Sequence, residues 1–161
     1  MAKKALKWVG ILLGVAGLAA IGLVLWLTVR EYRPDPVEDV KIDRTGAPKQ
    51  IFLSPGDSLT VLSLNAGYAG LGKDSDFFMD GGTDVAPTRA QMDANLTGIS
   101  GLLDERKADV FFLQEVDTNS SRTNSVDQSQ IYWRSLLSDG KGTYSSTYAL
   151  NYSCDFVPFP W

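Results

Sequence analysis

The sequence predicts an α/β domain that follows a single transmembrane helix, and three stretches support this prediction. Residues 8–29 form a long apolar span, and residues 59–64 and 109–115 are short runs rich in β-favouring side chains. A segment with helical periodicity separates the two short runs. A strand, a helix and a second strand in this order form a right-handed crossover unit with parallel strands. We therefore expect a parallel strand pair at the centre of the domain.

The amino-terminal segment has the features of an uncleaved membrane anchor. Lys3, Lys4 and Lys7 precede residues 8–29, which carry no charge and are long enough to cross a bilayer. The lysines favour a cytoplasmic location for residues 1–7, which places the domain outside the cytoplasm. A cleaved signal peptide is the competing interpretation, but its apolar core usually has only about 7–15 residues. We expect a single-pass protein of the cell membrane.

Gly10 and Gly14 form a pair of small residues with the spacing that lets two membrane helices approach closely. Glycine is also common in membrane helices in general. A transmembrane homodimer and an unpaired anchor are therefore both open interpretations of this spacing.

Residues 30–50 are expected to form an extended linker, because they contain three prolines and many charges but few large apolar side chains. The domain should then begin near residue 51, with residues 51–53 as an edge strand. Residues 54–57, Ser-Pro-Gly-Asp, predict a turn before the first central strand. The single cysteine, Cys154, excludes an intrachain disulfide within this sequence.

The charge of the domain argues against a nucleic-acid partner. The sequence has 15 basic and 19 acidic residues, and removal of Lys3, Lys4 and Lys7 leaves 12 basic against 19 acidic residues, a net charge of −7. Sequence-independent nucleic-acid binding requires Lys and Arg side chains that neutralise phosphates. A small phosphate ester or a lipid head group fits this balance better.

Polar side chains end both predicted strands. The run at 59–64 is followed by Asn65, and four large apolar residues at 110–113 are followed by Gln114 and Glu115. A strand that is apolar on both faces is typical of a sheet covered on both sides, where ligands bind at the carboxyl ends of parallel strands. We expect Asn65 and Glu115 to share one cleft, although Glu115 is also compatible with a solvated strand end.

The segment between the strands, residues 87–106, predicts a helix that starts at Pro87. Its apolar residues are spaced to form one face: Met92, Leu96, Ile99 and Leu103. Residues 131–137 and 144–150 predict a short helix and a further strand.

The motif residues resemble a known family. Ser63-Leu64-Asn65 and the segment from Asp109 to Gln114-Glu115-Val116-Asp117 resemble the amino-terminal half of the endonuclease/exonuclease/phosphatase family, whose members cleave phosphate esters with a divalent metal. Residues 151–160 are similar to a membrane-anchored bacterial branch of this family. The resemblance implies a layered α/β sandwich with two packed mixed sheets flanked by helices.

The same resemblance implies roles for individual residues. Glu115 would bind the metal, Mg²⁺ or Mn²⁺, and Asn65 would bind the phosphate and order the metal site. Arg122 lies in the polar loop that follows and is a candidate for a phosphate contact or for a solvated surface residue. Asp117 is expected to be an ordinary loop residue.

The family pattern also requires a histidine and an aspartate near its carboxyl end, and this sequence contains no histidine. We therefore expect residues 51–161 to be the amino-terminal part of a larger domain that is inactive by itself. The expected function of the full-length protein is metal-dependent hydrolysis of a phosphate mono- or diester at the membrane. The alternative is a non-catalytic, membrane-tethered binding module with the same fold.

Overall fold

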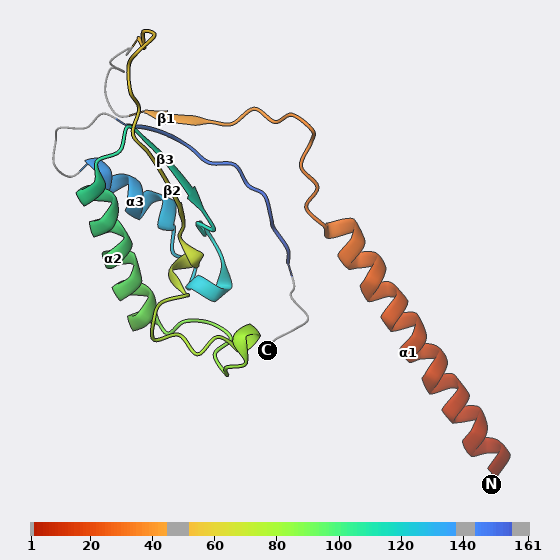
Figure 1. Cartoon of the computed structure of the whole chain (residues 1–161). Coiled ribbons are helices and arrows are strands. Elements are labelled where there is room, and N and C mark those ends of the chain that lie inside the picture. The colour runs from red at the N-terminus through yellow and green to blue at the C-terminus, as the bar shows by residue number, and fades with distance from the viewer. Residues whose placement is uncertain (1, 45–51, 138–143, 156–161) are drawn as a thin grey trace. The chain divides into compact units, whose positions relative to one another are not determined.

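The computed structural model describes residues 2–44, 52–137 and 144–155. The chain divides into two compact units. One consists of Met1–Asp39 with Ala149–Trp161, and the other of Val40–Tyr148. The first unit contains the apolar helix, and the second contains the mixed α/β structure (Figure 1).

Helix α1 (Ala2–Arg30) corresponds to the predicted membrane span. Its 29 residues extend about 44 Å at the usual rise of an α-helix, compared with about 30 Å of bilayer hydrocarbon. By length and composition it is able to cross a membrane, and a signal sequence near the amino terminus would satisfy the same criteria. The helix begins at Ala2, so the three lysines expected in a separate tail belong to its first turns.

The predicted parallel pair of strands is present in the second unit. Strands β2 (Val61–Asn65) and β3 (Val110–Gln114) are parallel, and their register places Asn65 opposite Gln114. Helix α2 (Arg89–Arg106) connects them. The crossover brings residues about 50 positions apart in sequence to the same edge of the sheet.

The start of α2 differs slightly from the prediction. Thr88 is the N-cap, and its side chain accepts a hydrogen bond from the Gln91 amide while the Gln91 side chain bonds back to Thr88. Such a reciprocal box satisfies two of the amide groups that a helix start otherwise leaves unpaired. Pro87 therefore lies just before the cap rather than in the first turn.

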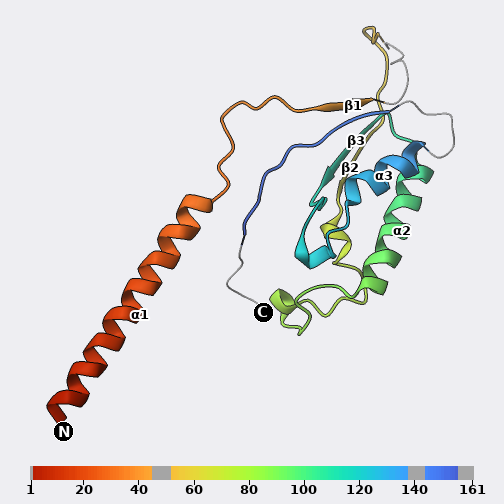
Figure 2. The same ribbon diagram turned by 180° about the vertical axis from the view of Figure 1, so that it is seen from behind.

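The core lies between the sheet and two helices. Figures 1 and 2 show α2 and α3 (Gln128–Leu137) on the same side of the β2–β3 pair. Apolar residues of both helices are buried there, namely Met92, Leu96, Leu103 and Tyr132. Half-buried residues of the strands pack against them: Leu62, Leu64, Phe111 and Leu113. The predicted apolar face of α2 is thus confirmed, including the half-buried Ile99.

The expectation that β3 is covered on both faces is wrong for the described residues. The alternate side chains of the two strands face away from the helices, and Val61 and Phe112 are 53% and 57% exposed. Both helices pack on the opposite face of the sheet. No described element covers the face that carries Val61 and Phe112.

A second, smaller sheet lies outside the predicted scheme. Strand β1 (Ile42–Arg44) pairs antiparallel with β4 (Ser145–Thr147). β1 falls within residues 30–50, which were expected to be a linker, and β4 is shorter than the strand expected at 144–150. Phe52 and Leu53 do not form the predicted edge strand, and Ile51 lies outside the described residues. The turn at 54–57 is present, because the Asp57 amide donates to the Ser54 carbonyl.

Candidate functional site

The loops that follow β2 and β3 are joined by backbone hydrogen bonds. The Ala66 amide donates to the Gln114 carbonyl at 2.8 Å, and the Tyr68 amide donates to the Glu115 carbonyl at 2.8 Å. The pairing of the two strands therefore continues beyond their ends. This continuation fixes the relative positions of the polar residues at the carboxyl edge of the sheet.

Asn65 and Glu115 are in direct contact, as expected from the topology. Asn65 Nδ2 donates to Glu115 Oε1 at 2.8 Å, and Asn65 Oδ1 accepts from the Gly67 amide at 2.8 Å. The two bonds together fix the orientation of the amide group. The Glu115 backbone has a φ of 53°, a left-handed conformation that is uncommon for residues other than glycine and turns the chain sharply at the strand end.

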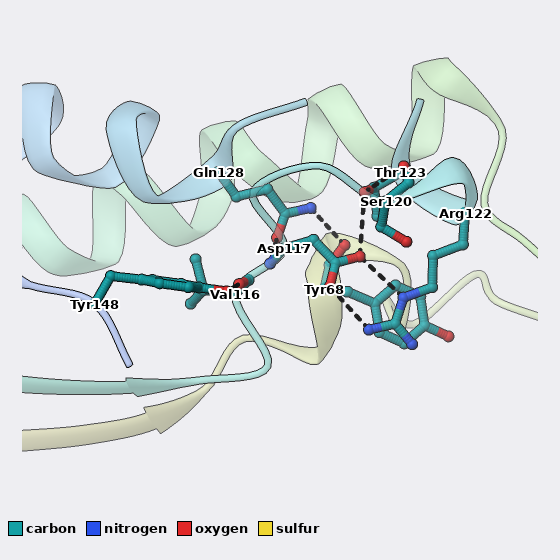
Figure 3. Close-up of polar contacts among 8 residues, drawn as sticks. All are labelled: Tyr68, Val116, Asp117, Ser120, Arg122, Thr123, Gln128 and Tyr148. Atoms are coloured by element: carbon teal, nitrogen blue, oxygen red, sulfur yellow. Dashed lines mark hydrogen bonds and ion pairs between the residues drawn. The ribbon is translucent and has the colours of Figure 1, made fainter. Parts of the chain in front are cut away.

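Arg122 is held against the same two loops. Its Nε and Nη2 atoms donate to the two carboxylate oxygens of Asp117, both at 2.9 Å, and its guanidinium lies 3.8 Å from the centre of the Tyr68 ring (Figure 3). A bidentate pair with a carboxylate and a stack on an aromatic face both restrict the plane of a guanidinium. Arg122 is therefore a positioned side chain and not a freely solvated one.

Asp117, expected to be an ordinary loop residue, organises this region. Besides Arg122, its side chain accepts a hydrogen bond from Thr123 Oγ1 at 3.1 Å and is only 13% exposed. Its backbone is tied to Gln128, because the Gln128 amide donates to the Asp117 carbonyl and the Asp117 amide donates to Gln128 Oε1.

Gln128, at the start of α3, joins the loops after both strands. Its Nε2 atom donates to the Tyr68 carbonyl at 2.7 Å, and the residue is completely buried. Figure 3 shows this amide between Asp117 and Tyr68. A single buried side chain thus holds the loop that carries Tyr68 to the loop that carries Arg122.

The charges of the site alter the acidity of its members. Burial raises the pKa of Tyr68 above its ordinary value, Arg122 opposes this rise, and Glu115 and Asp117 add to it. The hydrogen bond with Asp117 raises the pKa of Arg122, although partial burial acts in the opposite direction. Tyr68 is therefore neutral and Arg122 cationic at neutral pH.

The residues at the strand ends have the chemistry of a hard-cation site with few protein ligands. Glu115 is exposed, and its Oε1 atom accepts a hydrogen bond from Asn65. Its Oε2 atom has no hydrogen-bond partner among residues 2–44, 52–137 and 144–155. The described residues contain no group of three or more Asp, Glu or Cys side chains able to hold a metal. Magnesium commonly uses one or two protein carboxylates and completes its shell with water, so a single carboxylate is compatible with it.

The sequence patterns point to Asn65, Glu115 and Arg122 as site residues but not to Tyr68 or Gln128. Tyr68 follows closely after a strand end, which is a detectable signal for an aromatic residue near a site. Nothing in the sequence around Gln128 distinguishes it from the other polar residues near the start of α3. Only its contacts with two distant loops reveal its role.

No family model, curated protein or solved structure matches this chain.

Proposed function

We propose that this protein is a membrane-anchored, divalent-metal-dependent phosphoesterase of the endonuclease/exonuclease/phosphatase type, with its domain in a layered α/β sandwich. The observation that supports the proposal best is the hydrogen bond between Asn65 and Glu115 at the carboxyl ends of two parallel strands. Ligand sites of α/β sheets lie at this edge. An amide that orients a carboxylate there has the form of a metal site with its supporting partner.

Glu115 is the proposed ligand of Mg²⁺ or Mn²⁺. Glu115 is an exposed residue, and the Asn65 amide keeps its Oε1 atom in place, which leaves Oε2 for a cation. A divalent ion bound at this carboxylate would polarise a phosphoryl oxygen. In the described structure the Asn65 oxygen is used by the Gly67 amide, so Asn65 acts first by orienting Glu115.

Arg122 is the proposed phosphate contact. It is cationic, close enough to Glu115 to interact with it electrostatically, and 46% exposed. A guanidinium recognises phosphate oxygens by charged hydrogen bonds. The acidic balance of the chain favours a small phosphate ester or a lipid head group as substrate over a nucleic acid.

We also propose that α1 remains in the cell membrane with the domain on the extracytoplasmic side, because Lys3, Lys4 and Lys7 lie at its amino-terminal end. Protease added to intact spheroplasts should then remove the domain and leave α1 behind. Full protection of the domain while the membrane stays intact would contradict this orientation.

Metal binding provides the test of the site, because the sequence has no histidine to complete the family's catalytic centre. Mn²⁺ binding to the full 161-residue chain in detergent micelles can be measured by electron paramagnetic resonance. Glu115→Gln keeps the shape but removes the charge, and the Kd for Mn²⁺ should rise by about tenfold or more, the loss expected when a ligand or its support is removed. Glu105→Gln changes an exposed carboxylate on α2 and should leave the Kd unchanged.

If Glu115→Gln binds Mn²⁺ as tightly as the unchanged chain does, Glu115 is only a solvated strand end. The non-catalytic binding module would then be the better description of the protein.

A further inference from the structure

We propose that Tyr68, Gly70 and Asp117 form a platform that positions Arg122 to bind one oxygen of a phosphoryl group. This inference rests on the proposed function, since it deepens the account of its phosphate subsite. Tyr68, Gly70 and Asp117 are positioning residues, and Arg122 is the residue that touches the ligand.

The pairing with Asp117 leaves one edge of the guanidinium available. Asp117 engages Nε and Nη2, whereas Nη1 has no hydrogen-bond partner in the described part of the chain. The Asp117 side chain is 13% exposed and the Arg122 side chain 46% exposed. Asp117 is thus largely buried, whereas the Arg122 side chain keeps nearly half of its surface exposed to a ligand.

The Tyr68 ring supports the face of the guanidinium. Tyr68 is 5% exposed, and the Arg122 carbon Cζ lies 3.8 Å from its ring centre. The Tyr68 backbone is left-handed, with a φ of 43°, and is held by Glu115 through its amide and by Gln128 through its carbonyl. A backbone conformation that costs about 1 kcal/mol or more persists only where its surroundings enforce it. The position of the ring is therefore set by a backbone bond to Glu115 and by the buried Gln128 side chain.

Gly70 provides the space that the ring occupies. A Cβ atom at Gly70 would lie 2.1 Å from Tyr68 Cε2 and 2.6 Å from Tyr68 Cδ2. The backbone of Gly70, with φ −104° and ψ −18°, is open to any residue. The requirement for glycine here is thus explained mainly by the Tyr68 ring, with Pro87 Cγ at 3.1 Å as a second close neighbour, and not by the backbone. Alanine at this position would force the ring away from its place beneath Arg122.

The experiment measures binding of inorganic phosphate to the full chain in detergent micelles, by isothermal titration, with Mg²⁺ and with EDTA. Arg122→Lys keeps the charge but loses the planar fork, and should weaken phosphate binding by about tenfold. Gly70→Ala and Tyr68→Leu should each weaken it by several-fold. Arg89→Lys is the matched control, because Arg89 is also paired with an aspartate, Asp93, but lies on the surface of α2. It should have no effect.

A double variant separates the proposed platform from a general loss of structure. Gly70→Ala acts on Arg122 by displacing the Tyr68 ring, and leucine has no ring to stack on the guanidinium, so Gly70→Ala should cause little further loss of phosphate affinity once Tyr68→Leu is present. Strict additivity of the two changes would overturn the platform. So would a chain that binds no phosphate under either condition, or an Arg122→Lys variant with unchanged affinity.

Failure of the platform and failure of the metal site give different results. If Glu115→Gln abolishes Mn²⁺ binding while Arg122→Lys leaves phosphate affinity unchanged, the platform is refuted and the metal site stands. If Mn²⁺ does not bind but the platform variants still lose phosphate affinity, the metal site is refuted and the phosphate subsite stands.

Discussion

Replacement of Gln128 by alanine should be the most damaging polar substitution near the site. Gln128 is completely buried, donates to the Tyr68 carbonyl at 2.7 Å and accepts from the Asp117 amide at 3.2 Å. Alanine removes both bonds and leaves two backbone groups of the site loops without their partner. The loops after β2 and β3 would then keep their backbone bonds, the Asn65–Glu115 hydrogen bond and the Arg122–Tyr68 stack, but would lose the buried link between Asp117 and Tyr68.

The size of the effect follows from these contacts. Each backbone group left unsatisfied in a buried place costs about 1–3 kcal/mol, so the two groups together cost roughly 2–6 kcal/mol. Water that enters the vacated space offsets part of this cost. We expect the free energy of unfolding to fall by about 4 kcal/mol, a large fraction of the roughly 5–15 kcal/mol typical of a domain.

Hydrogen-exchange mass spectrometry on the full chain in micelles is the suitable assay, because it reports on residues 110–137 separately from α1. Gln130→Ala is the control, since Gln130 lies on the same helix and its side chain makes no hydrogen bond within the described residues. Protection of residues 110–117 and 128–137 should fall in Gln128→Ala and not in Gln130→Ala. If the two variants differ by less than about 1 kcal/mol, Gln128 does not hold the two loops together.

Two further substitutions test the packing of the helices. Tyr132 is 1% exposed, and its hydroxyl has no hydrogen-bond partner among the described residues, so Tyr132→Phe should raise the free energy of unfolding by about 1 kcal/mol at pH 7. Burial raises the pKa of Tyr132 from 10.0 to about 12. The folded state therefore holds this proton more tightly than the unfolded state, and the resulting stability is complete below pH 10 and lost as the pH rises to about 12. Urea unfolding at several alkaline pH values should show a shallower loss for Tyr132→Phe, and an equally steep loss would contradict this account. Thr88→Ala removes the N-cap of α2 and should cost about 1 kcal/mol, whereas Thr88→Ser should retain most of the stability in the same measurement.

The sequence was sufficient to predict the elements that carry a clear hydrophobic pattern, either a continuous apolar run or a periodic apolar face. The apolar span of α1, the periodic face of α2 and the β-favouring runs of β2 and β3 all correspond to elements of the structure. The proximity of Asn65 to Glu115 was also predictable. A strand, a helix and a strand leave few topologies, and the parallel one brings the two strand ends to the same edge.

The tertiary structure alone decided which residues support that edge. β1 and β4 pair across about 100 residues, and no local pattern specifies such a partner. The helices cover only one face of the β2–β3 pair, although the apolar run in β3 is equally compatible with cover on both faces. Tyr68, Asp117 and Gln128 meet through left-handed loop residues and long-range hydrogen bonds, which depend on where three separate segments end in space. Local propensity encodes the helices and strands, but the network that holds Arg122 and Glu115 exists only once those segments have packed together.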